Sequence, residues 1–215
     1  MISVWVEHVN GHWYGVAHHA GRLVATASGA DREAAARSVR ACLPRGREYR
    51  MVAEGSEYAR GVVRLLERLE AGEEAAPSLE LCPDCVGEPL ASVARVASAI
   101  PRGYVATYGG IAAAAGTDAR VVGHAMATNP LYPIIPCHRV VGADLSLVGY
   151  TGSRDAPARR VKLERLRAEA RGFKEARTLA TPLPGAVGLA VIPVERVIVR
   201  AVRDGLDDGG QLSLW

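Results

Sequence analysis

The stretch TYGGIAAAAGTDARVVGHAMATNP, residues 107–130, contains two short helical segments with a turn between them. Gly116 ends the first segment, Thr117 or Asp118 can cap the second, and Pro130 closes it. Two short helices joined by a tight turn that contains glycine are typical of a helix-turn-helix. The middle of the chain is therefore predicted to hold this motif.

The second helical segment has two different faces. One face is predicted to be buried, because its residues recur at the i, i+3, i+4, i+7 spacing of a helix stripe: Val122, Ala125, Met126 and Asn129. The other face carries one long cation among smaller side chains: Arg120, Gly123, His124 and Ala127. Small side chains let a helix backbone approach another surface closely, and the minor groove of DNA is one such surface. An exposed helix with an ordinary surface arginine accounts for the same residues equally well.

Residues 133–141, PIIPCHRVV, follow directly and place Cys137 beside His138 in an apolar run. A thiol attacks only as the thiolate, and the ordinary pKa of cysteine leaves little thiolate at neutral pH. A neighbouring histidine can take the proton, directly or through a water, and a carboxylate can orient that histidine. Glu169 is the candidate carboxylate. A buried structural cysteine is the competing interpretation, because adjacent side chains often diverge.

Two further helices are predicted on either side of these segments. Residues 89–100 form the first and residues 156–172 form the second. The apolar side of the second is predicted to consist of Val161, Leu163, Leu166 and Ala170. Glu169 lies at the edge of that side, so its carboxylate can point inward.

Residues 1–75 are predicted to form a separate mixed domain of strands and helices. Asn10-Gly11 lies between two β-rich runs, which is a strong hairpin signal, and Gly21 indicates a second turn. Two helices are predicted to follow, each with a capping residue: 31–43 with Asp31 and 56–72 with Ser56.

The remaining segments divide the chain. Residues 76–87 are acidic and broken by prolines, which predicts a linker before a second domain at 88–172. Residues 173–215 form an extension. Its part at 182–202 is predicted as one or two strands, and 203–215 as a flexible tail.

Composition and charge limit the classes of protein. The chain has 215 residues, 49% of them hydrophobic, and its apolar runs are too short to predict a transmembrane helix. The N-terminus lacks the pattern of a secretory signal, so we expect an intracellular, cytoplasmic protein without a membrane partner. Residues 90–180 carry 13 basic and 6 acidic groups, a net charge of +7. This segment could face a polyanion, or it could be a solvated basic surface.

Amide and cysteine content leave two questions open. Asn occurs only at positions 10 and 129 and Gln only at 211, which suits a hot environment, although the preference for Arg over Lys also fits a GC-rich genome. Cys82 and Cys85 in CPDC have the spacing of half a zinc site or of a redox pair. A metal, a disulfide and plain thiols all remain open for this pair.

NPLYPIIPCHRVVG resembles the active-site signature of the O6-alkylguanine-DNA alkyltransferase family. PRGYVATYGGIA, ARVVGHAMATNP, VGYTG and the helix with Glu169 occur in the order and at the spacings of that family. The likeness covers residues 88–172, and residues 1–75 in architecture only. It implies an α+β fold, with a small RNase H-like N-terminal domain and a mostly helical second domain that contains the helix-turn-helix. The extension lies outside the common core, and the turn before Arg120 is shorter than usual.

The resemblance also implies a role for each site residue. Cys137 would accept the alkyl group, His138 would act as base through a water, Glu169 would orient His138, and Asn129 would be the hinge. Tyr108 would rotate the target nucleotide, Arg120 would fill the space of the flipped base, and the backbone of Val140 would read the guanine amine. Tyr150 and Thr151 would line the pocket lid. Gly123, His124 and Ala127 would face the DNA.

The expected function is therefore DNA repair by direct damage reversal. A monomer would transfer one alkyl group from O6-alkylguanine in duplex DNA to Cys137 from the minor-groove side, without a cofactor or metal, and O4-alkylthymine is a further candidate substrate. Base flipping is needed because a buried thiol does not reach a stacked base. The alternatives are a non-catalytic lesion sensor, which in that fold replaces the cysteine, a helix-turn-helix regulator, and a Cys-His hydrolase.

Overall fold

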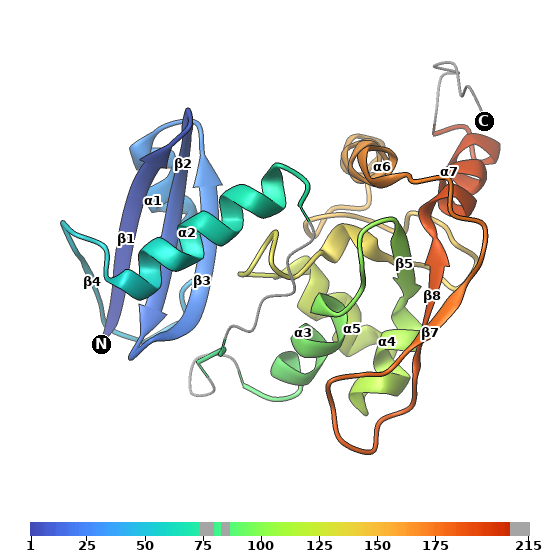
Figure 1. Ribbon diagram of the computed structural model, residues 1–215, viewed down its shortest axis with the longest axis horizontal. Helices are drawn as coiled ribbons and strands as arrows, with labels where there is room; N and C mark the ends of the chain where they lie inside the picture. The colour runs from blue at the N-terminus through green and yellow to red at the C-terminus, as the bar shows by residue number, and fades with distance from the viewer. Residues whose placement is uncertain (74–79, 83–86, 207–215) are drawn as a thin grey trace. The chain divides into compact units, whose positions relative to one another are not determined.

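The computed structural model describes residues 1–73, 80–82 and 87–206, and they fall into two compact units (Figure 1). The first unit contains Met1–Ala91 and Asn129–Ile135, and the second contains Ser92–Thr128 and the chain from Pro136 onward. Both units combine helices with a small sheet, which confirms the predicted α+β class. Within the described residues, no helix is long and apolar enough to cross a membrane.

The first unit is built on a four-stranded sheet in the order β3-β2-β1-β4. Its strands are β1 (Ile2–Val9), β2 (His12–His19), β3 (Arg22–Gly29) and β4 (Tyr49–Met51). The first three form an antiparallel meander, and β4 runs parallel to β1. Asn10 and Gly11 both have positive φ, at 49° and 85°, as a two-residue hairpin turn requires. Gly21, with φ of 72°, closes the second turn, so both predicted hairpins are confirmed.

Two helices cover opposite faces of this sheet (Figure 1). They are α1 (Arg32–Ala41) and α2 (Glu57–Glu70). Asp31 caps α1 by accepting from the Ala34 N–H at 2.7 Å, and Ser56 caps α2 by accepting from the Ala59 N–H at 3.2 Å. The side chains of β2 alternate between the two helices, because successive residues of a strand point to opposite faces. Both predicted helices and both predicted caps are confirmed.

Two segments from later in the chain complete the first unit. The Thr26 N–H donates to the Pro130 carbonyl at 2.7 Å, and the Thr26 hydroxyl donates to the Tyr132 carbonyl at 2.9 Å. Leu81 forms a parallel bridge with Leu23, and Cys82 is buried among the core residues of the sheet. Part of the predicted linker at 76–87 therefore packs as core. Cys85 lies outside the described residues, so the pairing of the CPDC cysteines stays open.

The second unit follows the predicted order of elements up to the extension. Its elements are α3 (Leu90–Ser98), β5 (Tyr104–Thr107), α4 (Tyr108–Ala115), α5 (Ala119–Ala127), the 3-10 turn η1 (Cys137–Arg139), β6 (Val140–Val141), α6 (Ala156–Glu169), β7 (Arg177–Leu179), β8 (Leu189–Pro193) and α7 (Val194–Arg203). The sheet has the order β6-β5-β8-β7. In this sheet β5 and β6 are parallel, whereas β8 of the extension pairs with β5, and β7 with β8, in antiparallel fashion.

The predicted helix-turn-helix is formed by α4 and α5. Gly116 ends α4 in the left-handed conformation with φ of 66°, and Asp118 caps α5 by accepting from the Arg120 N–H at 2.8 Å. The predicted inner face is buried at Val122, Ala125 and Met126. The predicted outer face at Arg120, His124 and Ala127 is exposed, with Gly123 half-buried. Asn129 lies beyond the end of α5 and is half-buried.

Two predictions on the C-terminal half are wrong in part. Of the one or two strands expected at 182–202, β8 (Leu189–Pro193) is present, but residues 194–203 form the helix α7. The β-branched side chains favour a strand, but Val194, Val197, Ile198 and Ala201 fall on one helical stripe that packs into the core. On α6, Val161 is exposed and Lys162 is buried, so the helix is rotated relative to the predicted apolar side. The predicted flexible tail lies mostly at 207–215, outside the described residues.

Candidate active site

The second unit contains a pocket of about 520 Å³. Its walls come from α4, α5, Cys137 and the loop at 148–154. A volume of this order suits a small aromatic ligand rather than a single ion. Eight predicted site residues line it: Tyr108, Arg120, Gly123, His124, Ala127, Cys137, Tyr150 and Thr151. The structure thus brings together residues from four separate sequence motifs.

Cys137 lies at the first position of η1 and is only 4% exposed. Asn129 organises the turn that precedes it in the chain. The Asn129 side chain donates to the Ile135 carbonyl at 2.8 Å and accepts from the Leu131 N–H at 2.9 Å. One amide therefore satisfies a donor and an acceptor of the same turn, which an aspartate or an alanine could not do. This geometry suits the predicted hinge role of Asn129, which stays a prediction.

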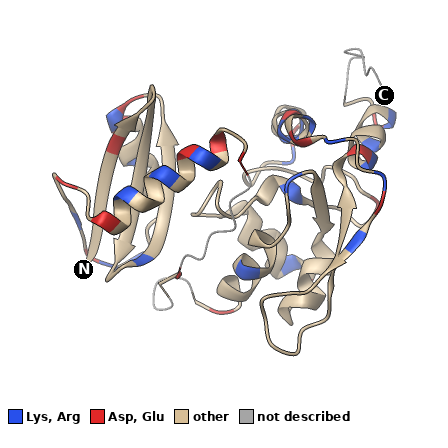
Figure 2. Ribbon diagram, in the orientation of Figure 1, with Lys and Arg blue, Asp and Glu red and all other residues tan. Residues whose placement is uncertain are grey.

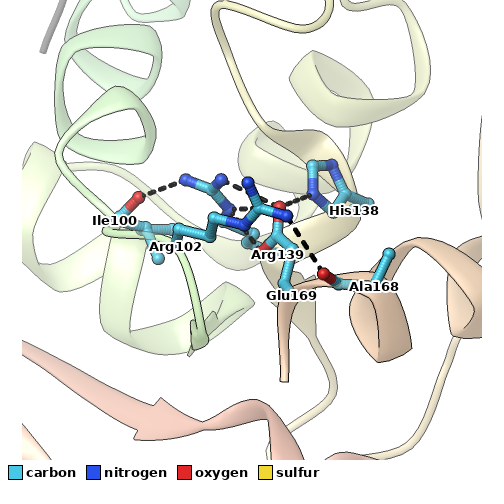
Figure 3. A network of polar contacts seen from close by, with 6 residues as sticks. All are labelled: Ile100, Arg102, His138, Arg139, Ala168 and Glu169. Atoms are coloured by element: carbon cyan, nitrogen blue, oxygen red, sulfur yellow. Dashed lines mark hydrogen bonds and ion pairs between the residues drawn. The ribbon is translucent and has the colours of Figure 1, made fainter. Parts of the chain in front are cut away.

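His138, the residue after Cys137, forms a buried pair with Glu169. Figure 3 shows His138 Nε2 within hydrogen-bond distance of Glu169 Oε1, at 2.8 Å. Both side chains are buried, His138 at 5% and Glu169 at 8% exposure. The prediction that Glu169 points inward is confirmed.

Arg139 holds the other side of the same carboxylate. Its Nε lies 2.9 Å from Glu169 Oε2 and its Nη2 lies 2.8 Å from Glu169 Oε1, which is a bidentate contact (Figure 3). Its Nη1 donates to the Ile100 carbonyl at 2.7 Å. Arg139 therefore has a local acidic partner, and it fixes the plane of the Glu169 carboxylate.

The electrostatics of this network define the proton positions. Burial alone would raise the pKa of Glu169, but hydrogen bonds from His138 and Arg139 outweigh it and lower the pKa to about 2. Burial lowers the pKa of His138, against the opposing effect of Glu169. A neutral imidazole next to a carboxylate must donate its Nε2 proton to that carboxylate. Nδ1 then carries the lone pair, so it is the nitrogen that can accept a proton.

Lys162 is a component of the site that sequence reasoning missed. It is fully buried, and its ammonium donates to the Val140 carbonyl at 2.5 Å and to the Gly149 carbonyl at 3.1 Å. It also lies 5.9 Å from the centre of the Tyr108 ring. Lys162 thereby ties β6, which follows Cys137, to the start of the pocket loop. No local pattern indicated this role, because lysine is rarely buried and the neighbouring Val161 fitted an apolar side better.

The free energy of unfolding should depend on pH in a way that reveals the burial of Lys162. Burial lowers its pKa from 10.5 to about 8, so between pH 8 and 10.5 the unfolded chain holds more protons than the native one. Wild type should therefore gain stability relative to Lys162→Met as the pH rises through this window, by on the order of 3 kcal/mol. Urea unfolding at pH 7.5, 9 and 10 measures this difference. Lys174→Met, at an exposed position, should show no such gain. A pH-independent difference for Lys162→Met would contradict the assignment.

The loop that closes the pocket has an unusual backbone. Tyr150 is buried and bridges Ser153, while Thr151 is exposed with φ of 48°. Val140 does not line the pocket, and its carbonyl already accepts from Lys162. A carbonyl has two lone pairs, so a second donor can still reach it. Sequence reasoning missed the other wall residues: Ala119, Met126, Val148, Gly149, Gly152, Ser153 and Arg154.

The pocket places a buried cysteine, Cys137, beside α5 of the helix-turn-helix. This arrangement is that of a protein class in which the cysteine can act as a nucleophile next to a DNA-binding motif. Residues 90–171 match the model of the 6-O-methylguanine DNA methyltransferase DNA-binding domain. A methylated-DNA–protein-cysteine methyltransferase of Methanosarcina acetivorans is 39% identical over 113 residues, 52% of this chain and 72% of that protein. The enzyme of the same name from Pyrobaculum aerophilum is 62% identical over 53 residues, 25% of this chain and 36% of that protein.

A solved structure extends the likeness beyond this segment. The crystal structure of Mycobacterium tuberculosis OGT in complex with DNA is 25% identical, with a TM-score of 0.54 over 78% of this chain and 94% of that one. The chain belongs to the methylated-DNA–protein-cysteine methyltransferase family. The family predicted from the sequence is confirmed.

Proposed function

We propose that this protein repairs alkylated DNA by moving a methyl or larger alkyl group from O6 of guanine in duplex DNA to Cys137. The observation that carries the proposal is the placement of Cys137 in a pocket lined by α5 of the helix-turn-helix, with the following residue, His138, hydrogen-bonded to Glu169. O4-alkylthymine is a second candidate substrate. We expect the protein to act as a monomer in the cytoplasm, without a cofactor.

The reaction starts from a neutral His138 whose Nε2–H is bound to Glu169 and whose Nδ1 can accept a proton. The Cys137 thiol gives its proton to His138 Nδ1, directly or through a water, while Glu169 stabilises the imidazolium that forms. The thiolate attacks the alkyl carbon, a carbon–sulfur bond forms, and the bond between that carbon and O6 breaks. The electron pair stays on the guanine, which takes up a proton and is restored. Burial of the sulfur keeps water and unrelated electrophiles away until a base enters.

The helix-turn-helix would deliver the base. The target base must leave the stack, and Arg120 on the exposed face of α5 would occupy the space that it vacates. Gly123, His124 and Ala127 would let α5 approach the minor groove closely, and Tyr108 would help rotate the nucleotide. The Val140 carbonyl would accept from the guanine amine, and Tyr150 and Thr151 would cover the base. The net charge of +7 over residues 90–180 favours contact with phosphates.

Two alternatives fit less well. A lesion sensor of this fold does not need a nucleophile, whereas here Cys137 lines the pocket and has a base beside it in the chain. A regulator that reads the major groove uses long polar side chains, and the exposed face of α5 offers Arg120 and His124 among small residues. Figure 2 shows basic and acidic residues mixed along α2 of the first unit, whereas α5 of the second contains one arginine, Arg120, and no acidic residue.

Stoichiometry tests the proposal most directly. The product on Cys137 would be a thioether, which is not hydrolysed under mild conditions, so each chain should react once and then be inactive. Excess duplex with O6-methylguanine is mixed with protein, repaired guanines are counted, and the modified residue is mapped by mass spectrometry. We expect one methyl group per chain, on Cys137. Sustained turnover, or methyl on Cys42 or Cys82, would overturn this mechanism.

Arg120→Ala should separate base extrusion from chemistry. The Arg120 side chain is 96% exposed and sits at the start of α5, with only a 3.8 Å ion pair to Asp118. Extrusion costs a few kcal/mol, so losing the group that fills the gap should slow repair of duplex about 100-fold and reaction with free O6-methylguanine hardly at all. Single-turnover rates on both substrates measure this. Arg203→Ala, which removes an exposed cation of α7, is the control. Equal losses on both substrates would remove the proposed role.

A further inference from the structure

The chain that follows Glu169 is held by a residue from the extension. Helix α6 ends at Glu169, and Ala170 leaves the helical conformation with φ of −57° and ψ of 134°. The next two backbone N–H groups, of Arg171 and Gly172, both donate to Glu195 Oε1, at 2.9 and 2.6 Å. One carboxylate oxygen therefore fixes two successive peptide groups directly beyond the residue that orients His138.

The position of Glu195 is fixed by the packing of helix α7. Glu195 lies in the first turn of α7, whose residues Val194, Val197 and Ile198 are buried in the same core as Leu163 and Leu166 of α6. The strand before it, β8, pairs with β5, and the Val194 N–H donates to the Gly103 carbonyl at 3.0 Å. Glu195 is thus held at a set position relative to α6 rather than carried on a loop.

A second contact from the extension reaches the same place. Phe173 stacks on Tyr104 with 5.0 Å between ring centres. The ring lies where a Cβ on Gly103 would be, since such an atom would come within 2.8 Å of Phe173 Cε2. From outside the extension, Arg102 donates to the Ala168 carbonyl at 3.0 Å (Figure 3). The end of α6 is therefore held between the segment before β5 and the extension.

We propose that Glu195 is a positioning residue for alkyl transfer, and that the extension serves to hold the Glu169 end of α6 in register with His138. The proposal rests on the proposed function, because it assigns the purpose of this contact to the reaction at Cys137. Glu195 does not touch the reacting atoms. By holding residues 170–172, Glu195 sets the orientation of the Glu169 carboxylate. Glu169 in turn sets the orientation of the His138 ring, and so the direction in which Nδ1 points. Small errors in such directions are costly to a reaction that requires aligned groups.

Three variants test this: Glu195→Ala, Glu195→Gln and Val197→Ala. The glutamine keeps an oxygen that can accept both N–H groups, while the alanine removes it. Val197→Ala weakens the packing of the same helix without touching Arg171 or Gly172. At a temperature where all three are folded, Glu195→Ala should transfer methyl to Cys137 about tenfold more slowly than wild type. Glu195→Gln should recover most of the rate, and Val197→Ala should keep it despite a lower Tm.

A second measurement does not depend on methyl transfer. In free protein labelled at histidine, NMR follows the titration of the His138 imidazole. Glu195→Ala should shift this titration to lower pH, because a loosened Glu169 stabilises the imidazolium less, while Val197→Ala should not. An unchanged titration in Glu195→Ala would overturn the proposal, and so would equal slowing in Glu195→Ala and Val197→Ala. If wild type fails to methylate Cys137, the proposed function fails while the titration still decides the positioning of His138.

Discussion

Replacing Cys137 by serine should abolish methyl transfer while leaving the affinity for methylated duplex close to that of wild type. Serine has nearly the same shape, so the pocket formed with α4, α5 and the loop at 148–154 should persist. A hydroxyl remains protonated at neutral pH and is a far weaker nucleophile than a thiolate, so the reaction loses its attacking group. Mass spectrometry of the protein after exposure to methylated duplex, together with a gel shift on the same DNA, measures both properties.

Cys42→Ser is the matched control for this experiment. Cys42 is a half-buried free thiol of the first unit, and burial raises its pKa, which disfavours its thiolate. The Cys42 variant should therefore transfer one methyl group per chain, as wild type does. Methyl transfer that survives in Cys137→Ser would show that another residue accepts the group, and loss of DNA binding would show that the thiol shapes the pocket.

Glu169→Gln should have the second largest effect, because the side chain serves both catalysis and the fold. Its loss leaves the partly buried guanidinium of Arg139 without this anionic partner. Breaking a fully buried pair typically costs about 3 to 5 kcal/mol of stability, and this change should cost up to that amount. His138 would also lose the carboxylate that orients its Nε2–H and stabilises its cation. We expect a single turnover at least about 100-fold slower with an unchanged endpoint of one methyl group. Rapid-quench kinetics and urea unfolding measure the two effects.

The stabilising contribution of Glu169 should decrease as the pH falls. The pKa of Glu169 falls from 4.5 in the unfolded chain to about 2 in the fold, so its contribution is complete above pH 4.5 and is lost as the pH falls toward 2. Wild type should lose on the order of 3 kcal/mol more than Glu169→Gln over this range. Glu164→Gln, at an exposed position of the same helix, is the control and should behave as wild type. Parallel pH profiles for wild type and Glu169→Gln would contradict the buried pair.

Local signals in the sequence were sufficient for most of the fold. The Asn10-Gly11 turn, the caps Asp31 and Ser56 and the two helices of the helix-turn-helix each depend on residues within a few positions of one another. Family resemblance supplied the site residues, and the pocket gathers eight of them, although their roles stay predictions. The enzyme class is confirmed by the family to which the chain belongs.

What the sequence did not reveal depends on distant contacts. Val194, Val197 and Ile198 are favourable in a strand, and only a core already formed by β5 and α6 makes their helical stripe the better arrangement. The burial of Lys162 is possible because two carbonyls, one from β6 and one from the pocket loop, accept hydrogen bonds from its ammonium group. Neither carbonyl can be identified from the residues next to Lys162 in the sequence. Such partners are set by tertiary structure, which pattern reasoning along one helix does not reach.

The hydrogen bonds of Thr26 to Pro130 and Tyr132 have a consequence for how this protein can be divided. The chain leaves the second unit at Thr128, is held by the first unit up to Ile135, and re-enters the second unit at Pro136, one residue before the nucleophile. The segment matched by the family's DNA-binding model, residues 90–171, is continuous in sequence, but its residues 129–135 pack with the first unit. A fragment that begins near residue 90 would keep Cys137, His138 and Glu169 and still lose the strand that anchors the approach to them. The first unit thus supplies the hydrogen bonds that hold residues 130–132, and a fragment without that unit would leave this segment without them.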